Sequence, residues 1–271
     1  MAATRFSALL ILPLVVVVTA FFILPMAELF ARSFASRTGG VTYAEIIATP
    51  RYLASLGATL AVAALTTVIT LVLSTLVGLL LARSRFPGRA LLLAVLTFPL
   101  AFPGVVVGFL VILLAGRQGL LGEITKAATG EKLVFAYSMN GLLVGYLYFS
   151  IPRVLLTVIA AAEKLDPALE EAARSLGAGP WRVLADIVLP ALAPALLASG
   201  ALAFATAMGA IGTAFTLATN IDVLPMVIYT EFTLNANIAM AAALSIVLGL
   251  ITWLVLAIAR QASGATVAAA G

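Results

Sequence analysis

Six long apolar runs, separated by shorter polar segments, decide what this chain can fold into. A helix needs roughly 17 to 25 mostly apolar residues to cross a hydrocarbon core about 30 Å thick, and each run is long enough. The runs lie at about 7–29, 56–82, 90–115, 138–162, 187–211 and 238–259. The sequence therefore predicts an all-α, polytopic membrane protein with six transmembrane helices and both termini on one side.

The composition supports this class and excludes several functions. Hydrophobic residues make up 63% of the chain and charged residues only 10%, whereas soluble domains have about 45 to 50% and about 25%. The chain contains no cysteine and no histidine, so disulfides, thiolate sites and the commonest general base are ruled out. The small net charge of +4 gives no reason to expect a nucleic-acid partner. An intramembrane enzyme is one function to consider, but it would need a catalytic pair of residues, and none presents itself in the spans.

The first apolar run has a second interpretation, because Arg5 precedes it and small residues follow it at 31–35. That arrangement is also found in cleaved secretory signals. The apolar region of a signal has only about 7 to 15 residues, and this run is longer. We therefore expect a retained transmembrane helix.

The density of arginine in the connections predicts the orientation. The short segment after the second run holds Arg83, Arg85 and Arg89, whereas the long segment 212–237 holds no lysine or arginine. Cytoplasmic loops carry the excess of basic residues. We therefore expect a multi-pass protein of the plasma membrane, in bacteria the inner membrane, with cytoplasmic N- and C-termini.

Prolines and glycine pairs predict irregular and closely packed helices. A proline inside a helix removes a backbone hydrogen bond and favours a kink, and Gly104 with Gly108 and Gly141 with Gly145 have the spacing that lets two helices approach closely. Kinked helices suit a path that opens and closes, but proline is frequent in membrane helices of every function. The prolines in or beside the runs are Pro13, Pro25, Pro99, Pro103, Pro152, Pro190 and Pro194.

Arg153 is the charged residue that lies within an apolar run rather than at its end. Such a charge is a functional candidate, although a long side chain can also reach polar surroundings by itself, and the structural role is the main interpretation. In the fifth run Ser199, Thr206 and Met208, with Gly209, are spaced to share a pathway-facing side. Contacts between helices are an equally good explanation for these small residues.

The polar segment between the fourth and fifth runs predicts a short, tightly bounded helix. Asp166 can cap it, Pro167 suits its first position and Gly177 its end. Glu170 and Arg174 are spaced to pair along it. One apolar stripe is expected along this helix, and a second helix at 181–186 leads into the fifth run. The stripe is formed by Leu165, Leu169, Ala172 and Leu176.

A helix of this kind can lie among lipid headgroups or bind a cytoplasmic protein. Glu170 and Glu171 are adjacent, and the polar face lacks the lysines expected beside an anionic leaflet. A docking element for a cytoplasmic protein therefore explains the residues better.

The same segment resembles the EAA loop of binding-protein-dependent ABC transporter permeases. The match consists of Glu171-Ala172-Ala173, three residues, Gly177, nine residues, Ile187, one residue and Leu189-Pro190. The junction of the second and third runs is also similar to that family, with Leu81-Ala82-Arg83, Phe86-Pro87-Gly88-Arg89, Pro99 and Pro103-Gly104. The likeness extends over the whole chain and implies one transmembrane permease domain over 1–271, with a core at 56–260 and a coupling loop at 164–186.

The resemblance implies a type I importer permease whose coupling helix sits in a groove of a cytoplasmic ATPase. Glu171 would make polar contact with that ATPase, and Ala172, Ala173 and Gly177 would allow close approach. The chain has no G-x-x-x-x-G-K-[ST] motif, so ATP and Mg²⁺ are expected on a separate subunit, and no cofactor on this chain. The coupling segment comprises Asp166, Pro167, Leu169, Glu170, Glu171, Ala172, Ala173, Arg174, Leu176, Gly177 and Pro190.

The expected partners are a second permease, identical or homologous, two ATPases, a periplasmic or lipid-anchored solute-binding protein, membrane lipids and a small polar solute. Segments 209–216 and 222–230 resemble permeases grouped with importers of polyamines, ferric iron, thiamine, sulfate-type oxyanions and phosphonates. The alternative is a stand-alone carrier or channel, which predicts inverted repeats or buried ionisable relays. Neither is evident in the sequence.

Overall fold

The computed structural model describes residues 11–35, 42–217 and 221–268, and these residues form helices and connections without a β-strand. Arg5, Arg37 and the expected start of the first span at Ser7 lie outside them. The described part of the first helix runs from Ile11 to Ser33. The elements are η1 (Thr19–Ile23), α2 (Leu24–Ser33), α3 (Thr42–Ala48), α4 (Pro50–Arg83), α5 (Arg89–Thr97), η2 (Phe98–Ala101), α6 (Gly104–Ala115), α7 (Leu120–Thr129), α8 (Met139–Ala162), α9 (Pro167–Ser175), α10 (Pro180–Val183), η3 (Leu184–Val188), α11 (Leu189–Gly209), α12 (Gly212–Leu217), α13 (Leu224–Thr233) and α14 (Ile238–Ala268).

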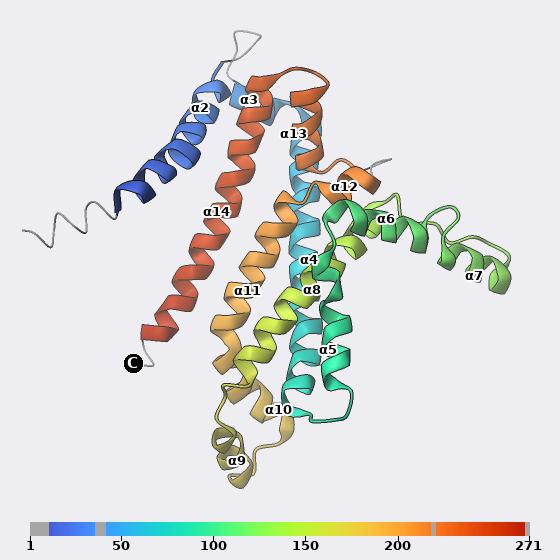
Figure 1. Cartoon of the computed structure of the whole chain (residues 1–271), viewed down its shortest axis with the longest axis vertical. Helices are drawn as coiled ribbons and strands as arrows, with labels where there is room; N and C mark the ends of the chain where they lie inside the picture. Colours follow the sequence, from blue (N-terminus) through green and yellow to red (C-terminus); the bar gives the residue numbers. More distant parts are fainter. Residues whose placement is uncertain (1–10, 36–41, 218–220, 269–271) are drawn as a thin grey trace, which may run out of the picture.

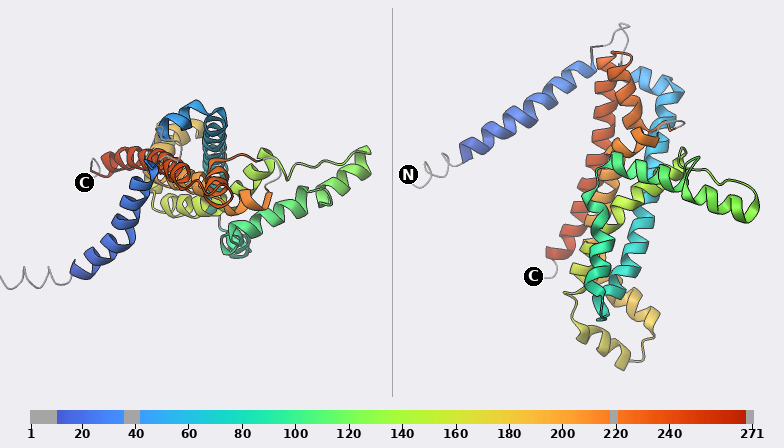
Figure 2. Two further views of the ribbon diagram at one scale, coloured as in Figure 1. Left: turned by 90° about the horizontal axis from the view of Figure 1, so that it is seen from above. Right: turned by 45° about the vertical axis from the view of Figure 1, so that its right-hand side comes forward.

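Four long helices, α4, α8, α11 and α14, run lengthwise and form the body of the molecule (Figure 1). The short helices α9 and α10 lie at one end, and α3 and α13 lie toward the other. The helix that contains α2 touches α14 near this second end and then leans away from the bundle (Figure 2). Its large apolar side chains, such as Phe21 at 80% exposure, are uncovered in the single chain.

Among the described residues, six helices are long and apolar enough to cross a membrane, which confirms the predicted number. The third of them is Gly104–Thr129, which overlaps the predicted third span, 90–115, only at 104–115. The other five predicted spans correspond to one helix each, and the sixth runs on to Ala268 rather than ending at about 259. The second span is longer than expected because α4 begins at Pro50, and the fifth begins at Pro180 because α10 and η3 continue into α11.

The third predicted span is divided rather than continuous. Residues 90–115 form α5, the 3₁₀ turn η2 and α6, with an extended residue, Pro103, before α6. Pro99 and Pro103 cannot donate the hydrogen bonds that a continuous helix needs. The chain therefore turns, and α6 and α7 run out sideways from the bundle (Figures 1 and 2).

The other prolines deform their helices less. One π-helical segment ends two residues before Pro25 and another ends two residues before Pro190, as expected where the regular hydrogen-bond pattern must adjust. Pro152 and Pro194 lie inside α8 and α11, which continue past them. The predicted irregularity is thus concentrated at Pro99 and Pro103.

Small residues bring the helices together. A side chain on Gly78 of α4 would meet Val158 of α8 at 2.8 Å, and one on Gly108 of α6 would meet Thr216 of α12 at 2.7 Å. A Cβ atom on Gly145 of α8 would likewise lie 2.6 Å from the Thr213 side chain of α12. The predicted close packing is therefore confirmed at Gly108 and Gly145. It concerns α12, which no sequence pattern had indicated.

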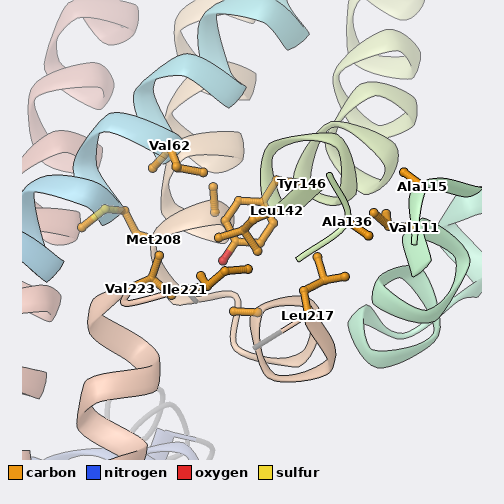
Figure 3. Close-up of a cluster of buried hydrophobic side chains, with 13 residues drawn as sticks. Val62, Val111, Ala115, Ala136, Leu142, Tyr146, Met208, Leu217, Ile221 and Val223 are labelled. Carbon is orange, nitrogen blue, oxygen red and sulfur yellow. The ribbon is translucent and has the colours of Figure 1, made fainter. Parts of the chain in front are cut away.

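The largest buried cluster lies where α4, α8, α11 and α12 meet (Figure 3). Tyr146 and Leu142 of α8 are at its centre, with Met208 of α11 on one side and Leu217 of α12 on the other. The Tyr146 hydroxyl donates a 2.7 Å hydrogen bond to the carbonyl of Ala210, where α11 ends. This bond stabilises the non-helical connection between α11 and α12, and Ala210 in that connection lines the pocket described below.

Candidate functional site

The ends of α9 are built as the sequence predicts. The backbone N–H of Ala168 donates to the Asp166 carboxylate at 2.9 Å, and Pro167 is the first helical residue. Gly177 has φ +84°, and the N–H of Ala178 donates across the turn to the carbonyl of Ala173 at 3.0 Å. Both termini are therefore closed by hydrogen bonds, which makes α9 a short, rigid element.

A network of ion pairs attaches α9 to the bundle. Glu170, whose side chain is only 13% exposed, accepts hydrogen bonds from Arg83 at the end of α4 and from Arg174, the latter at 2.9 Å. Nearby, Arg89 donates to Glu163 at 2.8 Å and also to the carbonyl of Leu81 at 2.8 Å. These groups line a cleft of about 730 Å³. The pair Glu170–Arg174 was predicted, but the partners of Arg83 and Arg89 were not, although the cluster of arginines in that segment was a signal.

The expected apolar stripe of α9 is divided between two surroundings. Leu165 packs with Val183 and Leu192 at the base of the bundle, whereas Leu169 is 55% exposed and Leu176 is 89% exposed. Trp181, at the start of α10, is 80% exposed. The expectation of one continuous stripe is therefore wrong for Leu165, and three large apolar side chains remain uncovered at this end.

The other predicted residues of the segment also keep accessible positions. Glu171, Ala172 and Pro190 are exposed, and Ala173 is half-buried against the base of the bundle. Glu171 forms no salt bridge within the part of the chain that the structure describes. Its carboxylate therefore has hydrogen-bonding capacity left for another molecule.

A second candidate site is an open pocket of about 360 Å³ where α8, the end of α11, α12 and the break before α6 meet. We call it the mid-bundle pocket because it lies partway along α8, and Arg153 in its wall is exposed in the single chain. Its wall brings together Arg153 of α8 with Thr206 and Gly209 of α11, as well as Phe102 and Gly104 at the break before α6. A guanidinium nitrogen of Arg153 donates to the Thr206 hydroxyl at 3.2 Å. Three of the five predicted pathway residues therefore share one pocket.

The other two pathway residues lie elsewhere. The Ser199 hydroxyl is buried and donates to the carbonyl of Ala195 at 2.7 Å, and Met208 is fully buried in the cluster around Tyr146 (Figure 3). Thr213 of α12 lines the pocket instead and donates to the Gly104 carbonyl at 3.0 Å. Sequence reasoning had not identified Thr213 as a wall residue, although it lies in a segment noted for its family resemblance.

The two sites differ in the groups that they offer to another molecule. The described residues contain no group of three or more carboxylate, histidine or cysteine side chains that could hold a metal ion. Arg153 forms no salt bridge with any described carboxylate. One site thus presents exposed apolar side chains, and the other a single positive charge on a helix long enough to span a membrane.

Comparisons with known proteins agree with these features. Residues 74–263 match the family described as binding-protein-dependent transport system inner membrane component. The chain is 40% identical over 155 residues to the molybdenum transport system permease protein ModB of Escherichia coli (strain K12), covering 56% of this chain and 67% of that protein. It is 37% identical over 179 residues to the sulfate transport system permease protein CysT of the same organism, covering 66% of this chain and 64% of that protein.

The fold is also similar to a chain in the crystal structure of a bacterial alginate ABC transporter in complex with an alginate pentasaccharide-bound periplasmic protein. The TM-score is 0.80, with 97% of this chain and 95% of that chain covered. The sequence identity is 17%, so this likeness concerns the fold alone.

Proposed function

Because this chain belongs to the family of binding-protein-dependent transport system inner membrane components and is the permease subunit of an ABC importer, we propose that it imports a tetrahedral oxyanion of the sulfate and molybdate type. Two relatives are named for sulfate and molybdenum transport. The observation that carries the solute class is the unpaired Arg153 in the mid-bundle pocket. Family membership also removes the stand-alone carrier or channel as an alternative.

The exposed surface of α9 and α10 is proposed as the docking site of the ATPase that drives transport. Leu169, Leu176 and Trp181 are large apolar side chains with no cover in this chain, and such exposure is typical of a protein interaction site. Glu170 holds α9 to Arg83 of α4. A push on the docking surface is therefore transmitted to a spanning helix as a rigid-body movement.

The remaining subunits follow from this arrangement as part of the proposal. Two separate ATPases bind and hydrolyse ATP with Mg²⁺, a second permease completes the path, and a binding protein delivers the oxyanion at the opposite face. The end of the bundle that carries α9 faces the cytoplasm, as do both termini. The uncovered apolar side chains of the first helix then face lipid or the second permease.

Reconstitution of the complete transporter tests the solute. With ATP inside proteoliposomes and the binding protein outside, we expect accumulation of ³⁵S-sulfate or ⁹⁹Mo-molybdate, and inhibition by excess unlabelled anion. ATP hydrolysis stimulated by the binding protein without accumulation of either anion, or uptake of thiamine, ferric iron or a polyamine instead, would contradict the proposed solute class.

A matched pair of substitutions tests the docking surface. Leu176→Ser removes the most exposed apolar side chain of the α9 end, whereas Leu234→Ser removes a leucine with 71% exposure beyond α13. We expect only Leu176→Ser to reduce the amount of ATPase that copurifies with the permease. Equal recovery of the ATPase with both variants would remove the docking assignment.

A further inference from the structure

Arg153 lies within a spanning helix and has no carboxylate partner among the described residues, whereas several arginines nearer the ends of the molecule have one. Arg83, Arg89 and Arg174 pair with glutamates at the α9 end, and Arg51 lies 3.7 Å from Asp222 toward the opposite end. Arg153 lies near the middle of α8, and no described carboxylate pairs with it. A charge at membrane depth is costly to place, and Arg153 is exposed in the single chain, so a partner from outside the chain can reach it.

The pocket around Arg153 has room for such a partner. Its volume of about 360 Å³ corresponds to roughly a dozen water molecules at about 30 Å³ each. A tetrahedral oxyanion that keeps part of its hydration shell therefore fits. Among the described residues, Arg153 is the only charged side chain in the wall, and no acidic side chain lines it.

The hydrogen bonds of the pocket leave the guanidinium available. Thr206 accepts from Arg153 at 3.2 Å while its own hydroxyl donates to the carbonyl of Leu202 at 2.7 Å. Thr206 thus orients the guanidinium but has no proton left for a ligand. The guanidinium has five N–H groups, and its planar fork matches two oxygens of an oxyanion.

We propose that Arg153 binds the translocated oxyanion inside the membrane span, and that Thr206 positions its guanidinium toward the pocket. This inference rests on the proposed import of an oxyanion. It adds a defined site within the permease, where one positive charge attracts the anion and a single flexible contact lets it leave again. Thr206 is a positioning residue that acts through Arg153.

The absence of cysteine from the chain allows a direct test of the charge. Gly209 lines the pocket, and a Cβ atom placed there has no neighbour within 4 Å. In Gly209→Cys, the single thiol can react with methanethiosulfonate reagents of similar size and opposite charge. The ratio of the rates for the anionic and the cationic reagent reports the potential beside Arg153.

The measurement uses the complete transporter in lipid nanodiscs, both without nucleotide and trapped with ATP and vanadate. We expect Arg153→Gln to lower the anionic-to-cationic rate ratio at Gly209→Cys by roughly tenfold, since the removed charge and the thiol line the same pocket. Arg153→Lys keeps the charge and should keep the ratio. Gly57→Cys in α4, an exposed position where a Cβ also has no neighbour within 4 Å, is the control and should keep its ratio in all variants.

Uptake completes the test. We expect Arg153→Gln to lower ³⁵S-sulfate or ⁹⁹Mo-molybdate uptake about tenfold, and Arg153→Lys to lower it less. Thr206→Val should lower both uptake and the rate ratio, and Thr206→Ser should restore them. Thr67→Val removes a hydroxyl that donates to its own helix in the same way, to the Ala63 carbonyl at 2.7 Å, and should change neither.

The outcomes separate the site from the solute. An unchanged rate ratio in Arg153→Gln, or a thiol in Gly209→Cys that reacts in neither state, overturns the inference, because Arg153 is then neutralised by another subunit or a lipid, or lies off the path. A changed ratio in a transporter that imports neither anion leaves the charged pocket in place and overturns the proposed solute.

Discussion

Different interactions stabilise the α9 end of the molecule and the helices around the mid-bundle pocket. At the α9 end, Glu170 and Glu163 pair with arginines from distant segments, and large apolar side chains remain exposed. Around the pocket, Gly108 and Gly145 are closed by threonines of α12, and the one charge, Arg153, pairs with no described carboxylate. Paired charges fix an element in place, whereas the unpaired and exposed Arg153 in the wall of an open pocket is free to bind another molecule.

Charge reversal at Glu170 should have the largest effect, because it removes the ion pairs that attach α9 to the bundle. Glu170→Lys replaces two ion pairs by two like-charge contacts, with Arg83 and Arg174. Hydrogen bonds to charged groups are worth about 1.5 to 3 kcal/mol each, so we expect uptake to fall roughly a hundredfold. The double variant Arg83→Glu with Glu170→Lys restores one pair and should recover part of the uptake. No recovery would mean that the pair is not what attaches α9.

A methyl group at Gly108 should disrupt the close packing of α6 against α12 without changing any charge. Its Cβ would lie 2.7 Å from the Cβ of Thr216, and overpacking typically costs about 1 to 3 kcal/mol. We expect Gly108→Ala to lower the thermal unfolding temperature of the purified complex. Gly249→Ala, where the added atom has no neighbour within 4 Å, is the control, and an equal temperature for both would contradict the close approach of α6 and α12.

Glu171 sharpens the comparison within the charged region itself. Unlike Glu170, it is exposed and has no ion pair among the described residues. We therefore expect Glu171→Lys to leave membrane insertion and the unfolding temperature unchanged but to weaken ATPase binding about tenfold, which corresponds to about 1.4 kcal/mol. Titration of the ATPase against nanodisc-bound permease measures this. An unfolding temperature lowered as far as in Glu170→Lys would mean that both glutamates serve the fold.

Gly177 tests the backbone at the same end, with the smallest expected effect. Its φ of +84° suits glycine, and alanine there costs about 1 kcal/mol. Gly177→Ala should reduce coupled ATP hydrolysis a few-fold, whereas Gly179→Ala, at φ −69°, should not. Because nothing lies within 4 Å of a Cβ at either position, any difference between the two variants reflects backbone conformation and not steric contact.

Much of the α9 end could be predicted because its signals are local. The Asp166 cap, the pair Glu170–Arg174 and the left-handed Gly177 depend on residues within one or two helical turns, and all three are confirmed. The partner of Arg83 was not predictable, since Glu170 lies far along the chain. The pairing depends on where α4 and α9 end relative to each other.

The pocket could be predicted only in part for the same reason. Arg153 and Thr206 were noted for their residue types, but their hydrogen bond depends on the crossing of α8 and α11. Met208 and Ser199 carry the same local signal as Thr206 and face buried surroundings. A pattern along one helix cannot distinguish these faces, because the neighbouring helices decide which face is covered.

By itself, the sequence determined the membrane class, the number of spans, the capped helix at 167–176 and the family, since hydropathy, capping and motif spacing act over short stretches of chain. The tertiary structure alone decided that the third span is divided, that Glu170 is anchored to Arg83, and that Arg153 opens into a pocket whose described wall holds no acid. These features arise where helices distant in sequence meet. Their distances are set by packing, which no local pattern encodes.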